Sequence, residues 1–161
     1  MPNLEILRNM RSRTGPVIGF FIVSSLKLAP ADTVLDAFTL LENKPRIQGL
    51  PIAAGKKVSG VLSREKIDNI PSIVGILSEK VSVLMEKDYF SAEFDELACD
   101  VLIRIKEREE TSLPGGLIIV NKKKAYAGFT SVVELSGRMS ALLKQRSPAE
   151  RSKKQAGGVL C

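Results

Sequence analysis

Two short segments of the 161-residue chain hold the side chains best suited to binding a polar ligand. Residues 60–66 read GVLSREK and residues 128–134 read GFTSVVE, so a serine follows a glycine by three positions in both. In the first copy, Ser63, Arg64 and Lys66 can donate hydrogen bonds to a phosphate. In the second copy, Ser131 and Glu134 have the spacing of a capping box, which satisfies free N–H groups at a helix start. Two roles are therefore open for the Glu134 side chain: it caps the helix start alone, or it caps the helix start and also contacts a ligand.

The sequence lacks the side chains that most enzymes use. It contains no histidine, which removes His-based triads, His metal ligands and the commonest general base near neutral pH. Its two cysteines are too few for a disulfide framework or a zinc site. We therefore expect no catalytic residue, no metal site and no required cofactor.

The positive charge is concentrated at the C-terminal end of the chain. The formal net charge is +6, and residues 141–161 account for +4 of it through five basic side chains and one acidic one. The sequence of residues 144–161 has no hydrophobic period, so we expect a flexible basic tail or linker. The scarcity of aromatic residues, at 5%, disfavours nucleic-acid binding, for which bases usually need stacking partners. The run Lys122–Lys124 is expected at a hairpin tip, mostly as a solvated turn.

Apolar spacing predicts the same order of elements in both halves. The first half contains an expected strand over 17–23, a helix capped by Asp32 or Thr33, a hairpin of 50–53 and 58–62, and a helix from Ser63. The second half contains an expected helix from about Glu93, strands over 117–120 and 125–130, and a helix from Ser131. An offset of 68 residues aligns the hairpins, placing Gly60 on Gly128 and Ser63 on Ser131. This repeat predicts two similar units related by a pseudo-twofold axis and packed together, since neither can bury its sheet alone.

The duplicated pattern resembles tandem cystathionine β-synthase (CBS) domains, the pair called a Bateman module. The first copy carries APADTVLDAFTLL and GLPIAAGKKVSGVLSREKI, and the second carries VSVLMEKDYFSAEFDEL and LIIVNKKKAYAGFTSVVEL. Val83 stands where the family often has Asp. The resemblance implies an α/β fold of two CBS-like repeats, each with a small three-stranded sheet and helices. The expected organisation is a lead-in over 1–16, repeat 1 over 17–75, repeat 2 over 76–143 and the basic tail over 144–161.

The resemblance also implies a regulatory function. CBS pairs commonly bind adenosine nucleotides such as AMP, ADP or ATP between their repeats, and they regulate an attached or partner enzyme or transporter. The second repeat is similar to CBS pairs joined to cyclic-di-GMP signalling enzymes. The family motif G-h-x-[ST]-x-x-[DN] ends in a ribose-binding Asp or Asn, which is replaced here by Lys66 and Glu134. Because lysine cannot accept from a diol, the nucleoside is expected at Ser131 and Glu134. The candidate ligand residues are Gly60, Ser63, Arg64, Lys66, Gly128, Ser131 and Glu134, together with Thr33, Pro51 and Ile52.

Two other functions remain alternatives: a degenerate CBS pair that acts only as a dimerisation scaffold, and a basic nucleic-acid adaptor. We expect a homodimer, because the last helix carries an apolar stripe on a unit too small to cover all its helices. The residues of this stripe in the last helix are Val132, Leu135, Met139 and Leu142.

No apolar run approaches the length of about 18 residues that spans a membrane, and a cytoplasmic location is expected.

Overall fold

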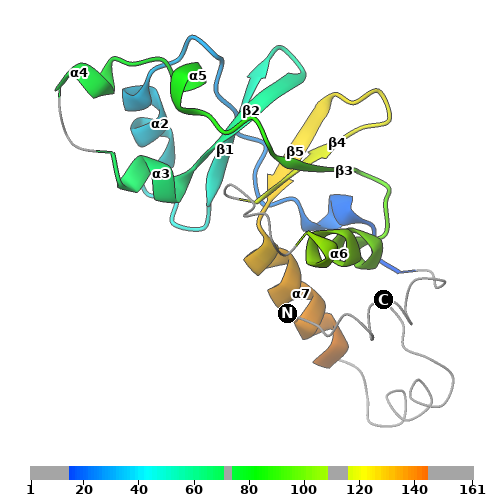
Figure 1. The fold of residues 1–161 in the computed structure, drawn as a ribbon. Coiled ribbons are helices and arrows are strands. Elements are labelled where there is room, and N and C mark those ends of the chain that lie inside the picture. The colour runs from blue at the N-terminus through cyan, green and yellow to red at the C-terminus, as the bar shows by residue number, and fades with distance from the viewer. Residues whose placement is uncertain (1–14, 71–73, 109–115, 145–161) are drawn as a thin grey trace, which may run out of the picture.

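The computed structural model describes residues 15–70, 74–108 and 116–144, so most of the expected lead-in and of the basic tail lies outside the described residues. Figure 1 shows two lobes whose hairpins meet at the centre of the molecule. None of the described helices is long and apolar enough to cross a membrane. In chain order the elements are η1 (Ile18–Phe21), α2 (Val34–Leu41), β1 (Gly49–Ala54), β2 (Lys57–Ser63), α3 (Arg64–Asp68), α4 (Val74–Leu77), α5 (Val81–Leu84), β3 (Phe90–Glu93), α6 (Ala98–Glu107), β4 (Leu117–Val120), β5 (Tyr126–Thr130) and α7 (Val132–Lys144).

The first repeat is built on the predicted hairpin. Strands β1 and β2 pair antiparallel, and Leu28 adds a single parallel bridge to Ile52 in place of a full third strand. Helix α2 begins where Thr33 caps it: the Thr33 hydroxyl accepts from the Asp36 backbone N–H, and Asp36 accepts from the Thr33 backbone N–H. Ala37 and Leu41, four residues apart on one face of α2, are buried in the core of this repeat, as the period of a helix requires. The core of this repeat comprises Leu28, Ala37, Leu41, Ile47, Leu50, Ile52, Leu62, Ile67 and Val81.

The second repeat holds a complete three-stranded sheet in the order β3-β4-β5. Strand β3 runs parallel to β4, and β4 pairs antiparallel with β5. All four residues of β4 are buried, as its continuous apolar sequence predicts for a strand covered on both faces. Helix α6 covers the sheet with a broad apolar face. The buried part of α6 comprises Ala98, Cys99, Val101, Leu102, Ile103 and Ile105.

The segment that leads into each repeat crosses to the hairpin of the other repeat. Ser24 bridges Phe129 on β5, and Glu86 bridges Val61 on β2. Both crossings are hydrogen-bonded, with the Phe129 N–H donating to the Ser24 carbonyl at 2.8 Å and the Glu86 N–H donating to the Val61 carbonyl at 2.8 Å. A small apolar cluster fills the space between the two hairpins. Its buried members are Val61, Ile118, Val120 and Phe129, so this cluster is a core shared by both repeats.

Two predicted elements differ from the structure for tertiary reasons. The expected strand over 17–23 is wrong over Ile18–Phe21, which forms the 3-10 helix η1. The Ile18 N–H donates to the Glu96 carbonyl at 2.7 Å and the Gly19 N–H donates to the Phe94 carbonyl at 3.0 Å, so this segment bonds to a loop instead of a strand. The helix expected from about Glu93 begins only at Ala98, because residues 90–93 pair with β4 as β3.

The apolar stripe of α7 faces the core of its own repeat along most of its length. Leu135 is fully buried and Met139 is 2% exposed, both in the core that also contains Ile18 and Phe21. Only Leu142, at 43% exposure, leaves that core. Because η1 supplies the surface that covers α7, the stripe as a whole is not available to a second copy of the chain. The stripe therefore does not support the homodimer that was expected from it.

Candidate functional site

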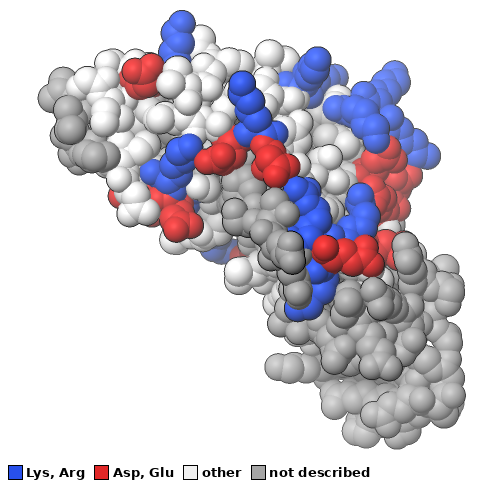
Figure 2. Space-filling model, viewed as in Figure 1, with Lys and Arg blue, Asp and Glu red and all other residues white. Residues whose placement is uncertain are grey.

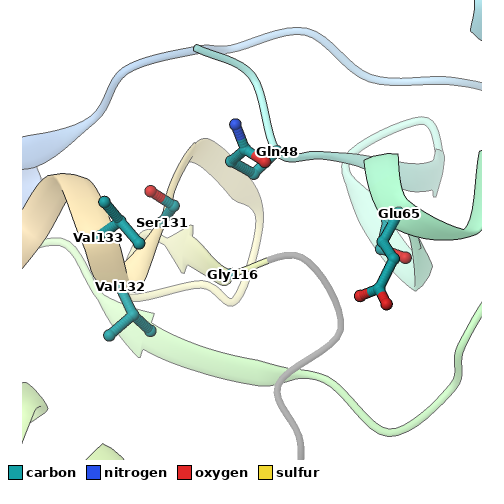
Figure 3. A pocket seen from close by; sticks show the side chains of 7 residues that line it. Gln48, Glu65, Gly116, Ser131, Val132 and Val133 are labelled. Atoms are coloured by element: carbon teal, nitrogen blue, oxygen red, sulfur yellow. The ribbon is translucent and has the colours of Figure 1, made fainter. Parts of the chain in front are cut away.

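A cleft of about 260 Å³ lies between the two repeats, at the end of the hairpins where the helices begin. Ser63 ends β2 and caps α3, and Ser131 follows β5 and precedes α7, so the pseudo-twofold arrangement brings both serines to one cleft. Figure 3 shows Gln48 between the start of α7, which carries Ser131, and the helix that carries Glu65. The residues that line the cleft are Gln48, Ser63, Glu65, Gly116, Ser131, Val132 and Val133.

The start of α7 is the part of the cleft best suited to an anion. The Ser131 hydroxyl accepts from the Glu134 backbone N–H at 3.1 Å, which satisfies one free donor of the first turn. The N–H groups of Val132 and Val133 come before any intrahelical acceptor is available to them. The partial positive charge of a 13-residue helix adds to these donors. This end of the cleft can therefore receive a phosphate group.

Glu65 provides a carboxylate on the other side of the cleft. Glu65 lies in the first turn of α3 and is exposed, and its carboxylate forms no hydrogen bond or ion pair with another described residue. Its oxygens can therefore accept from the hydroxyls of a ligand. Gln48 donates through Nε2 to the Pro45 carbonyl at 3.2 Å, which leaves the oxygen of its side-chain amide for a ligand donor. Glu65 was not among the expected ligand residues, although its place two residues after Ser63 puts it in the first turn of a helix.

Glu134 is engaged by Arg46 from the first repeat. Arg46 donates from Nε to Oε1 and from one terminal nitrogen to Oε2, both at 2.9 Å, in a bidentate pair. The carboxylate therefore does not turn back to the Ser131 backbone N–H, and the capping box is formed only by its serine half among the described residues. The hydrogen bond from Arg46 holds the pKa of Glu134 below its usual range, and the charges of Arg46 and Arg138 act in the same direction.

Arg64 and Lys66 are both occupied by partners within the chain. The Arg64 guanidinium donates to the Ile47 carbonyl at 2.6 Å and to the Lys44 carbonyl at 2.5 Å, which fixes the loop before β1. The Lys66 ammonium pairs with Glu86 at 3.0 Å. Neither side chain lines the cleft, so a contact with phosphate would require them to move.

The other candidate ligand residues have structural roles. Thr33 caps α2, and Pro51 and Ile52 are buried in β1. At Gly60 an added Cβ would lie 2.7 Å from the Glu86 carbonyl oxygen, and at Gly128 it would lie 2.7 Å from the Ile22 side chain. These two glycines therefore allow the crossing segments to pass close to β2 and β5. Of the ten candidate residues, Ser63 and Ser131 line the cleft.

The Arg46–Glu134 pair predicts a specific pH dependence of stability. Since the folded-state pKa of Glu134 is lowered, the pair stabilises the fold above the unfolded-state pKa, and this contribution is lost as pH falls through the folded-state value. Arg46→Gln should lower the free energy of unfolding slightly at neutral pH and leave it unchanged in acid, because exposed ion pairs contribute little.

Urea denaturation of the wild type and the variant at about pH 7 and about pH 3 measures this difference. Lys44→Gln is the matched control, because Lys44 is an exposed cation of the same loop that forms no ion pair with any described residue. A difference between wild type and Arg46→Gln that persists unchanged at low pH would contradict the role given to Glu134.

Comparisons with known proteins identify the fold. No family model and no curated protein sequence matches the chain. Among solved structures, a putative acetoin utilization protein (AcuB) from Vibrio cholerae is 19% identical with a TM-score of 0.66, over 84% of this chain and 100% of that chain. The CBS domain of a bacterial CNNM/CorC family Mg²⁺ transporter in complex with ATP is 11% identical with a TM-score of 0.63, over 86% and 98%. CBSX2 in complex with AMP is 20% identical with a TM-score of 0.60, over 82% and 100%.

These likenesses agree with the architecture built from the sequence. They cover most of both repeats and span nearly the whole of each similar chain. The chain therefore has the fold of a pair of CBS domains, with mixed α/β repeats packed about a pseudo-twofold axis. Within the residues that the structure describes, no group of three or more potential metal ligands occurs.

Proposed function

We propose that this chain, which has the fold of a CBS domain pair, is a non-catalytic regulatory module that senses an adenine nucleotide or a related phosphate ligand. The observation that carries the proposal is the cleft between the repeats, where the start of α7 faces an unpaired carboxylate, Glu65. The similar structures that hold ATP or AMP support a nucleotide as the ligand class. The ligand would act by changing how the two repeats pack, and a partner or attached effector would respond to that change.

The arrangement supports a definite binding mode. A phosphate would accept from the N–H groups of Val132 and Val133 and from the Ser131 hydroxyl, because these donors converge at the helix start. Ligand hydroxyls would donate to Glu65. Glu134 becomes available to the ligand only when Arg46 leaves it. That exchange costs little, because Arg46 is 72% exposed and can pair with the phosphate instead.

A thermal-shift panel tests whether the chain binds a ligand of this class. The panel contains AMP, ADP, ATP, S-adenosylmethionine and cyclic dinucleotides. A ligand that binds only the folded state stabilises it by about 2.7 kcal/mol at a hundredfold excess over Kd. If no member of the panel raises the melting temperature, the sensing function is wrong and the scaffold alternative replaces it.

Val133→Asp tests where the phosphate binds. Val133 is 79% exposed in the first turn of α7, where an acidic residue favours the helix, so this variant should fold at least as well as the wild type. The new carboxylate repels a phosphate at the same helix start, and we expect roughly a tenfold to hundredfold increase in the nucleotide Kd by calorimetry. Val83→Asp makes the same change at a 65% exposed site in α5 and should leave Kd unchanged.

Calorimetric titration with the nucleotide also identifies which carboxylates accept hydrogen bonds from the ligand hydroxyls. Glu65→Gln and Glu134→Gln should each weaken nucleotide binding, whereas Lys66→Ala should not, since Lys66 has only donors and pairs with Glu86. Each variant is also melted without ligand, because a change at a helix start can alter stability by itself. Loss of binding in Lys66→Ala, with Glu65→Gln and Glu134→Gln unaffected, would reverse the assignment.

One observation favours the scaffold alternative. Arg64, Lys66 and Glu134 are all satisfied within the chain, as expected of a repeat pair that no longer binds a ligand. A scaffold and a sensor both call for a homodimer, and a groove of about 400 Å³ between η1 and α7 offers a place for it. Phe20, at 70% exposure, and Leu142 lie on this groove.

We therefore expect Phe20→Glu and Leu142→Glu to convert a homodimer into a monomer without unfolding it. Burying two new carboxylates in an apolar contact is unfavourable, whereas both side chains are exposed in the single chain. Light scattering at micromolar concentration measures the mass, and Leu35→Glu, on the exposed face of α2, is the control. A wild-type mass of 17.5 kDa would refute the homodimer.

A further inference from the structure

The tips of the two hairpins form a second hollow, far from the cleft. The Tyr126 N–H donates to the Lys56 carbonyl at 2.8 Å, which holds the β4–β5 hairpin against the turn between β1 and β2. Between the tips lies a hollow of about 350 Å³, lined by Lys56, Lys57, Lys123, Lys124 and Ala125. Figure 2 shows basic side chains over both tips, at the top and right of the view.

The positive charge around this hollow is only partly balanced. Lys124 pairs with Glu93 at 2.5 Å. Lys56, Lys57 and Lys123 form no ion pair with any residue that the structure describes. Lys27 adds a further charge, because its ammonium donates to the Gly55 carbonyl in the first tip. Three cations from the two repeats, Lys56, Lys57 and Lys123, therefore line one hollow without a carboxylate partner among the described residues.

The backbone fixes where these lysines start. In the second tip the Asn121 carboxamide oxygen accepts from the Lys123 N–H at 2.9 Å and from the Ala125 N–H at 3.0 Å. Lys124 has a φ of 64°, a left-handed conformation that favours glycine or asparagine. The first tip turns at Gly55, whose φ is 63°. Both turns are therefore tight, and an anion in the hollow would meet ammonium groups carried by two hydrogen-bonded hairpin turns.

We propose that this hairpin lysine site, comprising Lys56, Lys57 and Lys123 around the hollow, binds a compact anion that carries several phosphate groups. The charges converge on a hollow rather than along a stripe, which suits a small ligand better than a nucleic-acid backbone. Among the residues that the structure describes, no aromatic side chain lines the hollow, so these residues offer no surface on which bases could stack. The site is separate from the cleft, because β2 begins at Lys57 beside the hollow and ends at Ser63 beside the cleft, about 20 Å away for a strand of this length.

Calorimetric titration of the full chain with sodium tripolyphosphate tests the site. At about 50 mM salt we expect binding that weakens clearly at about 300 mM salt, because exposed charges are screened. Lys56→Glu combined with Lys123→Glu should weaken binding roughly tenfold or more, since each change removes an attraction and adds a repulsion. Lys44→Glu combined with Lys80→Glu makes the same change in net charge at exposed positions away from the hollow and should alter Kd less than about twofold.

Outcomes of three kinds would overturn the proposal. The first is that the wild type does not bind tripolyphosphate at the lower salt concentration. The second is that Lys56→Glu with Lys123→Glu binds it as the wild type does, or that Val133→Asp abolishes binding, which would place the anion in the cleft. The third is that a single-stranded oligonucleotide of about 20 nucleotides binds through these lysines while tripolyphosphate does not, which would make the surface a nucleic-acid site. The variant with Lys56→Glu and Lys123→Glu is also titrated with a nucleotide that binds the wild type. If this variant binds the nucleotide as the wild type does, the result at the hairpin tips is independent of the proposed sensing function.

Discussion

Replacing Phe129 with alanine is expected to destabilise the chain by about 3–5 kcal/mol, the usual cost of removing a buried aromatic ring. Phe129 is 1% exposed and belongs to the cluster that joins the two repeats. The same cluster contains Ile118, its cross-strand partner on β4, and Val61 of the other repeat. Because the cavity would open at the contact between the repeats, both should lose stability together.

Urea denaturation followed by far-ultraviolet circular dichroism and by tyrosine fluorescence measures this effect. Tyr89 and Tyr126 pack against the same cluster, so their fluorescence reports on the contact between the repeats. Leu35→Ala is the control, because Leu35 is 53% exposed, and it should cost less than about 0.5 kcal/mol. A cost below about 1 kcal/mol for Phe129→Ala, or two separate transitions in the wild type, would show that the repeats do not share a core.

Gly60→Ala is expected to destabilise the chain by about 1–3 kcal/mol, because the added Cβ has no room. It would lie 2.7 Å from the Glu86 carbonyl oxygen and 2.8 Å from the Met85 sulfur. The Glu86 carbonyl cannot move freely, since it accepts from the Val61 N–H at 3.0 Å. The substitution therefore separates β2 from the crossing segment or strains both.

Two other glycines serve as comparisons in the same denaturation experiment. Gly128→Ala places its Cβ against the Ile22 side chain rather than against backbone, so it should cost less than Gly60→Ala. Gly137→Ala should stabilise the chain by about 0.5–1 kcal/mol, because Gly137 lies within α7 with open space around it. If Gly60→Ala were as stable as the wild type, the close crossing at Glu86 would be wrong.

Both predictions bear on the cleft, because the cleft exists only while the repeats are packed together. Ser63 reaches it from the first repeat and Ser131 from the second, and each lies a few residues from the shared cluster along β2 or β5. A destabilised contact between the repeats would therefore weaken ligand binding without touching the lining. For this reason ligand titrations of cleft variants need a melting curve beside them.

The sequence by itself determined the features that depend on near neighbours along the chain. The duplicated hairpins at an offset of 68 residues predicted two similar units, and β1–β2 and β4–β5 confirm them. The caps were also readable, since Thr33, Ser63 and Ser131 each accept from an N–H three residues later. These predictions succeeded because turns, caps and helix periodicity are set by residues within one or two turns of each other.

Only the tertiary structure decided which partners the polar side chains take. Arg46 and Glu134 are 88 residues apart, and no local pattern indicates that they meet. Residues 18–21 have the composition of a strand, yet they form η1 because the loop after β3 supplies carbonyl acceptors there. Glu65 rather than Lys66 lines the cleft because the packing of the repeats fixes which face of α3 is turned toward α7. Such contacts join segments distant in sequence, so their identity is set by how the two repeats pack and not by the spacing of residues within either one.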